Sequence, residues 1–245
     1  MARRDRHPQV TAAQAQQVAA AQAQETDDSR AAALVQRLLA LGIDGRGPFD
    51  GAAAVARRAR AGHPSTESAV HEVVRRHTRL VAAGGFATGV GGLVTLPVAL
   101  PANVLGFYVL ATRAVAAVAE LRGYDTSRPE VRSAVLLTLV GADATDVLKS
   151  AGLPRLNLGG RLVSLATRRW PPAVLMLVNK GVGFRLLARL GTGGLVRVGS
   201  RAVPVLGGAI GAGADVLMLR RIAKHAEHAL PPVAAGRADG DPERS

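Results

Sequence analysis

Apolar residues recur three or four positions apart along most of this chain, and no segment shows a sustained alternation of apolar and polar residues. A repeat of 3.6 residues places such positions on one face of an α-helix, whereas a half-buried strand needs a repeat of two. Glycine, proline and serine-rich turns separate the periodic stretches. The pattern predicts an all-α fold, with helices near residues 29–41, 50–61, 67–83, 102–122, 130–141, 142–152, 161–169, 172–190, 195–203 and 207–229.

One segment stands out because its 33 residues, 80–112, include no charged side chain. It is longer than the roughly 20 residues that cross a bilayer as a helix. Pro97 and Pro101 argue against one straight span, because proline removes a helix hydrogen bond and clashes with the preceding turn. We therefore predict a helical hairpin with arms at 81–96 and 102–118 and a turn at the two prolines. The hairpin is either buried in protein, re-entrant in lipid or part of a true span.

This hairpin is predicted to be the glycine-rich, hydrophobic centre of a multi-helix bundle. Gly85 and Gly89 lie four positions apart, and so do Gly207 and Gly211 in a second glycine-rich stretch. Small residues at this spacing let two helix backbones approach closely. We expect these glycines to form the contact between the two helices that carry them.

A few polar residues interrupt the apolar stretches and need partners if they are buried. Lys180 and Asp215 are expected to meet each other or a backbone terminus. Asn103, Arg113 and Asp125 are expected to form a second internal network. These five residues either fix the helices by hydrogen bonds or line a ligand pocket.

The net charge is +13, and it is unevenly placed: residues 149–224 contain 13 basic side chains and one acid, Asp215. Such a balance indicates an anionic partner, such as lipid headgroups, nucleic acid or an acidic protein. Nucleic acid has little support, because aromatic residues are 3% of the chain and no helix-turn-helix module is recognisable. The residues expected to contact an anionic surface are Arg185, Arg189, Arg197, Arg201, Arg220, Arg221 and Lys224.

Catalytic and metal-binding patterns are weak. There is no cysteine, no GxxxxGK[ST] phosphate loop and no GxSxG nucleophile motif. His225 and His228 share a helix face, but a third metal ligand is not evident. We therefore expect no cofactor, no metal site and no enzymatic activity.

The chain termini are polar. Residues 1–30 are predicted to be disordered or loosely helical, 31–229 to form a single helical domain, and 230–245 to be a disordered tail. The first 30 residues lack the apolar core of a secretory signal peptide, so we expect a cytoplasmic location.

The stretches "GGFATGVGGLVTLPVALPANVLGFYVLATRAVAAVAELRGYD", "VNKGVGFRLLARL" and "RAVPVLGGAIGAGADVLMLRRIAKHA" resemble, in order and spacing, the signature of the bacterial EcsC family. The resemblance covers about residues 32–228. The name-giving member is encoded beside an ABC transporter, and the family has no settled biochemical activity. The resemblance thus implies a membrane-linked accessory role by association.

Together these features favour a non-enzymatic, membrane-associated helical accessory protein, peripheral or re-entrant at the inner membrane. Its expected partner is an anionic membrane surface or a membrane protein complex. One alternative is a soluble helical enzyme or ligand-binding protein with a polar pocket in the bundle. A second alternative is a basic nucleic-acid binder.

Overall fold

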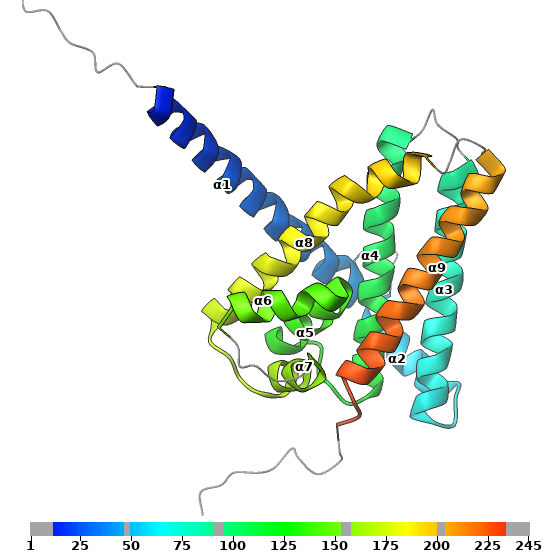
Figure 1. Ribbon diagram of the computed structural model, residues 1–245. Coiled ribbons are helices and arrows are strands. Elements are labelled where there is room, and N and C mark those ends of the chain that lie inside the picture. The colour runs from blue at the N-terminus through cyan, green and yellow to red at the C-terminus, as the bar shows by residue number, and fades with distance from the viewer. Residues whose placement is uncertain (1–11, 47–49, 91–95, 153–157, 200–203, 234–245) are drawn as a thin grey trace, which may run out of the picture.

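The computed structural model describes residues 12–46, 50–90, 96–152, 158–199 and 204–233. Within these ranges, side chains are described for residues 22–46, 50–84, 104–152, 162–189 and 212–233. The described part of the chain is helical and contains no strand, so the predicted all-α bundle is confirmed (Figure 1). The elements are α1 (Ala12–Leu38), the π-helix η1 (Leu39–Asp44), α2 (Ala52–Ala61), α3 (Thr66–Val90), α4 (Leu96–Leu121), α5 (Pro129–Val140), the 3₁₀ turn η3 (Gly141–Asp143), α6 (Ala144–Ser150), α7 (Leu158–Thr167), α8 (Pro172–Gly199) and α9 (Pro204–Ala229).

Helix α4 is the core of the bundle. It contacts α2, α3, α5, α8, α9 and η1, and its described residues from Val104 to Leu121 are mostly buried. A helix that is apolar all round must be covered on every side, which explains the central position of α4 (Figure 1). Within the described residues, the segment Val104–Leu121 is the one helix long and apolar enough to span a membrane, and 72% of it is buried inside the protein.

Helices α3 and α4 form the predicted hydrophobic hairpin, but its turn lies elsewhere. The prediction placed the turn at Pro97 and Pro101, and the structure places both prolines inside α4, near its start. The first turn of a helix has backbone N–H groups without intrahelical partners, so Pro97 sacrifices no bond there. Pro101 forfeits a single bond close to the helix end, which the packing of α4 outweighs.

The glycines at 191, 193 and 194 were expected to interrupt the helix that begins near residue 172. Instead α8 is one helix from Pro172 to Gly199. Isolated glycines lower helix propensity by about 1 kcal/mol each, and tertiary packing routinely overrides a cost of that size.

Helix α1 projects from the bundle, and only its C-terminal part lies against the other helices, chiefly α8 (Figure 1). Gly183 of α8 permits this contact, because a Cβ there would lie 2.7 Å from the carbonyl oxygen of Ala31. The helix runs without a break through residue 30, where a domain boundary was predicted. The polar first part of the chain is therefore helical from Ala12.

The C-terminus of α9 is held by the segment that follows α4. Arg122 is buried, and its guanidinium donates hydrogen bonds to the carbonyl oxygens of Glu227 and Leu230, the latter at 3.0 Å. Tyr124 donates its hydroxyl proton to the carbonyl oxygen of Pro231 at 2.8 Å. A cation at a helix C-terminus satisfies the last carbonyls and opposes the negative end of the helix dipole.

Replacing Arg122 with methionine should lower the free energy of unfolding by about 2–4 kcal/mol, because buried carbonyls lose a charged donor. Denaturant unfolding followed by circular dichroism measures the effect. Arg58→Met is the matched control: Arg58 forms an exposed ion pair with Asp50 at 2.8 Å, and its loss should cost less than about 1 kcal/mol. Equal losses in the two variants would contradict this role for Arg122.

Candidate functional site

Four helix ends gather at one end of the bundle: the end of α3, the start of α4, the end of α8 and the start of α9 (Figure 1). The described residues without charge at this end are 80–90 of α3, 96–103 of α4 and 204–214 of α9. We refer to these three segments as the uncharged end; the end of α8 differs, because it carries Arg197.

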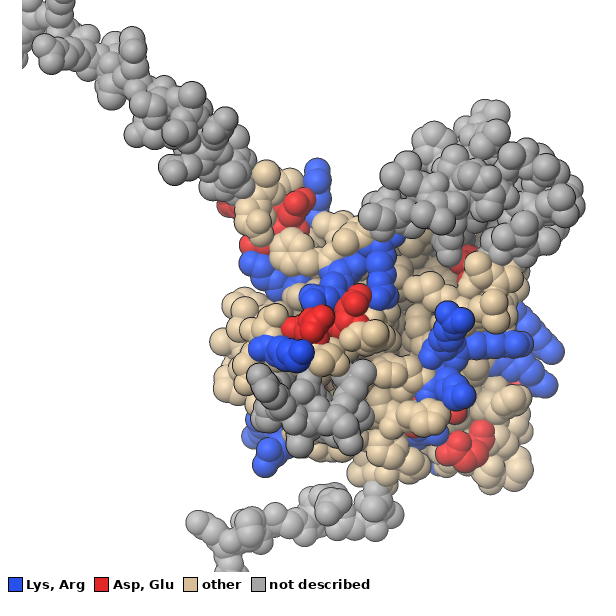
Figure 2. All heavy atoms as spheres, in the orientation of Figure 1, with Lys and Arg blue, Asp and Glu red and all other residues tan. Residues whose placement is uncertain are grey.

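Beside the uncharged end, α3 and α9 form a surface rich in arginine. The two helices run in opposite directions and share the most extensive interhelical contact among the described residues. Figure 2 shows Lys and Arg side chains gathered over this part of the molecule. We call this group the cationic belt; its exposed members are Arg75, Arg76 and Arg79 on α3 and Arg220, Arg221 and Lys224 on α9.

Two exposed leucines mark the border between the belt and the uncharged end. Leu80 of α3 is 45% exposed and Leu217 of α9 is 58% exposed. Leu80 directly follows Arg79, and Leu217 precedes Arg220, so each leucine lies on the side of the uncharged end. The surface of α3 and α9 thus changes from cationic to apolar along the helix axes.

The predicted anionic-surface residues divide into three groups. Arg220, Arg221 and Lys224 are exposed, and Arg185 is partly exposed. Arg197 and Arg201 lie outside the described side chains. Arg189 is partly exposed and bonds to the protein itself, so its assignment to a surface contact stays a prediction. The α3 arginines of the belt were not among the residues predicted to contact an anionic surface.

Arg189 closes the C-terminus of α5. Its guanidinium donates to the carbonyl oxygens of Leu139 at 3.2 Å and Val140 at 2.8 Å, and it pairs with Asp143 at 2.8 Å. Gly141, directly after α5, has a φ of 59°, so the chain turns sharply and leaves these carbonyls open to a side-chain donor. Arg189 thus serves the fold.

Lys180 has a partner that the sequence did not suggest. Its ammonium donates to Asp28 Oδ2 of α1 at 2.6 Å and lies 5.8 Å from the ring centroid of Phe184. This bond lowers the pKa of Asp28. Lys180 therefore fastens α1 to α8 and is paired with Asp28 rather than with Asp215, which is 1% exposed in α9.

The other three residues of the predicted network lie apart. Arg113 of α4 is buried and donates to the carbonyl oxygen of Leu41 at 2.8 Å. Asp125 is exposed in the loop after α4, where its carboxylate accepts a bond from the backbone N–H of Ser127 at 2.8 Å, a bond that helps lower its pKa. The side chain of Asn103 lies outside the described residues. The five residues are thus not shown to share one pocket.

The predicted glycine contact falls outside the described side chains, since Gly85, Gly89, Gly207 and Gly211 lie in parts of α3 and α9 where burial is not described. The two helices that carry them do pack together. The role of the four glycines stays a prediction.

Among the residues whose side chains are described, no group of His, Asp and Glu is arranged to hold a metal ion. His225 is half-buried and burial lowers its pKa, while His228 is exposed with its Nδ1 2.7 Å from the carbonyl oxygen of Lys224.

His77 is a buried titratable group that the sequence analysis did not single out. It lies in α3 beside the belt residue Arg76, is 2% exposed, and its Nδ1 is 2.8 Å from the carbonyl oxygen of Val73. The pKa of His77 is lowered to about 4, chiefly by burial and in smaller part by the nearby charges of Arg113 and Arg76. The imidazole is therefore neutral at physiological pH.

The model of the EcsC protein family matches residues 64–230 of the chain. This range begins just before α3, includes α4 to α9, and excludes α1, η1 and α2. No curated protein and no solved structure matches the chain.

His77 makes stability depend on pH. Its pKa is about 4 when folded, against an ordinary value of 6.5, so the unfolded chain binds the proton more tightly. The free energy of unfolding should therefore fall as the pH drops below 6.5, by about 2 kcal/mol between pH 7 and pH 5.

His77→Leu should remove most of this pH dependence over that interval, as measured by denaturant unfolding at several pH values. His71→Gln, a change at an exposed position of the same helix, should retain it. A His77→Leu variant with the full wild-type slope would show that another group titrates.

Proposed function

The chain therefore belongs to the EcsC family, and we propose that it is a non-enzymatic accessory protein that binds an anionic membrane surface. The cationic belt would lie at the lipid headgroups, and the uncharged end would enter the acyl layer. The proposed location is the cytoplasmic face of the inner membrane.

The observation that carries this proposal is the order of charged and uncharged residues along α3 and α9. From Arg79 to the end of α3 at Val90 the rise is about 16 Å, and from Asp215 back to the start of α9 it is about the same. The hydrocarbon core of a bilayer is about 30 Å thick. The uncharged end therefore has the depth of one leaflet.

The energetics of the belt fit peripheral attachment. An arginine or lysine near an anionic leaflet contributes about 1 kcal/mol, and stable attachment needs a second, apolar contribution. Leu80 and Leu217 are exposed where such a contribution would begin. A leaflet-deep insertion also agrees with α4, whose apolar segment Val104–Leu121 is covered by protein rather than available to cross the bilayer.

A link to a transporter remains part of the proposal. It rests on the family resemblance, in which the name-giving member is encoded beside an ABC transporter. A protein held at one leaflet by α3 and α9 would present the projecting helix α1 to a partner (Figure 1).

Vesicle sedimentation tests the proposal. The full-length protein should pellet with vesicles that contain anionic lipid and stay in solution with neutral vesicles, and added salt should weaken the binding. The double variant Arg220→Gln, Arg221→Gln should bind anionic vesicles about 30-fold more weakly, because two charges are removed.

The matched control is Arg168→Gln, Arg169→Gln, which removes two exposed charges between α7 and α8, away from the belt. It should bind nearly as well as the wild-type protein. Equal weakening in the two double variants would indicate a general charge effect and refute the belt. Preference for a short DNA duplex over anionic vesicles would favour the nucleic-acid alternative.

A further inference from the structure

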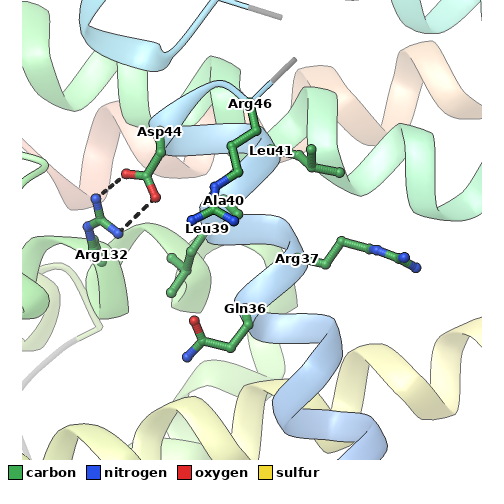
Figure 3. Close-up of a pocket in the computed structure, with 8 residues that line it drawn as sticks. All are labelled: Gln36, Arg37, Leu39, Ala40, Leu41, Asp44, Arg46 and Arg132. Atoms are coloured by element: carbon green, nitrogen blue, oxygen red, sulfur yellow. Dashed lines mark hydrogen bonds and ion pairs between the residues drawn. The ribbon is translucent and has the colours of Figure 1, made fainter.

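A second cationic site lies away from the belt, at the junction of α1 and η1. A cleft of about 380 Å³ opens there, with Arg132 of α5 on its far wall (Figure 3). Its volume lies in the range of pockets that hold small molecules. The residues that give it polar character are Gln36, Arg37, Asp44, Arg46 and Arg132.

The wall formed by η1 is fixed by the core of the protein. Arg113 donates to the carbonyl oxygen of Leu41 from inside the bundle. Gly42 leaves no space for a side chain, because a Cβ there would lie 2.8 Å from Cβ of Thr112 in α4. A π-helix is rare and frequently occurs at functional sites. The π-turn is therefore held in place by buried contacts, and the side chains it presents to the cleft are positioned with it.

The turn after η1 is equally constrained. Gly45 has a φ of 73°, and a Cβ on it would lie 2.1 Å from the backbone nitrogen of Gly51. Only glycine fits such a position. Asp44 and Arg46 directly flank Gly45, and both side chains line the cleft.

Arg132 is already oriented. Its Nε donates to the carbonyl oxygen of Thr126 at 2.9 Å, and its two terminal nitrogens form a fork with the carboxylate of Asp44 (Figure 3). The side chains are 26% and 39% exposed, respectively, so the pair lies at the surface of the cleft. Asp44 thus neutralises Arg132 and holds it in a single direction.

Two further arginines make the charge of the cleft positive. Among the described residues, Arg37 and Arg46 have no ion-pair or hydrogen-bond partner for their side chains. Figure 3 shows Arg46 folded back over Ala40 toward the Asp44–Arg132 pair, with the amide of Gln36 nearby. Arg37 points away on the other side of the helix. Arg46 and Arg132 against Asp44 give the cleft a formal charge of +1, and Arg37 adds positive charge from the opposite side of the helix.

We propose that this cleft binds a phosphate group, with Arg46 and Gln36 as donors beside the fixed Arg132–Asp44 pair. A phosphate monoester carries up to two negative charges near neutral pH and is attracted to the net positive charge of the cleft, and a guanidinium pairs with phosphate through two parallel hydrogen bonds. The phosphate belongs either to a soluble molecule or to a lipid headgroup. The proposal does not depend on the membrane function of the belt.

Calorimetric titration of the full-length protein with inorganic phosphate at constant ionic strength tests the site. Phosphate should bind with one-to-one stoichiometry, and chloride at the same ionic strength should not replace it. Arg46→Gln should weaken phosphate binding about tenfold or more, since it removes a charged donor. Arg30→Gln, which removes an exposed charge two turns earlier in α1, should bind as the wild type does.

Arg46 is exposed, so the variant should fold, and circular dichroism confirms this before titration. Arg37→Gln gives a second variant of the same cleft and should also weaken binding, by a smaller factor. The belt variant Arg220→Gln, Arg221→Gln should keep the affinity for phosphate. This separates failure of the cleft from failure of the proposed membrane function.

Vesicles with and without phosphatidic acid, whose headgroup is a phosphate monoester, then distinguish the two sources. Loss of phosphatidic acid binding in Arg46→Gln would assign the site to a lipid headgroup, whereas unchanged vesicle binding with weakened phosphate binding would assign it to a soluble phosphate compound. No detectable phosphate binding by the wild-type protein, or equal affinity in Arg46→Gln and wild type, would overturn the proposal.

Discussion

The capping of helix C-termini by arginine is the interaction on which the arrangement of the bundle depends. Arg60 donates to the last carbonyl of α4 at 2.5 Å, Arg122 closes α9, and Arg189 closes α5. Each helix end would otherwise present unpaired carbonyls within the packed structure, at a cost of about 1–3 kcal/mol per buried group. Arg113 serves the π-turn η1 in the same way. A guanidinium suits this role because its several donors can reach two carbonyls at once.

These caps also set which helices are neighbours. Arg122 stands after α4, contacts the end of α9 and lies 3.4 Å from the carboxylate of Glu67 at the start of α3. One side chain therefore links the start of α3 to the end of α9, in keeping with their antiparallel order beside the central helix. The cationic belt and the uncharged end follow from that order, because opposite directions bring the arginines of α3 level with those of α9. A change at the capped end would therefore reach the proposed membrane face through the helices themselves.

The hydrophobic pattern was sufficient to predict the helices and the burial of Val104–Leu121, because a helix that is apolar on all sides must be covered. It was insufficient for the partners of the charged residues. Lys180 pairs with Asp28, 152 positions away, and the arginine caps bind backbone carbonyls, which no residue pattern marks. The predicted position of the hairpin turn was wrong, because Pro97 and Pro101 were taken to end a helix. Proline is well tolerated near the start of a helix. One pattern in the sequence does point to a cap: Arg122 is followed by Gly123, and a basic residue before glycine is typical of a helix C-terminus.

Internal use of arginine changes what the net charge of +13 implies. Arg113 and Arg122 are buried and donate to backbone carbonyls, and the more exposed Arg60 and Arg189 also bond to carbonyls at helix ends. An even spacing of basic residues in the sequence therefore does not by itself predict a cationic surface. The belt on α3 and α9 and the cleft at η1 remain candidate anion sites, because their exposed arginines do not cap helix ends. The two sites differ in shape. The belt is broad and adjoins apolar surface, which suits a lipid leaflet. The cleft lies against the π-turn η1 and contains one acid, Asp44, which suits a single phosphate group. The same residue type thus builds the scaffold and both candidate anion sites.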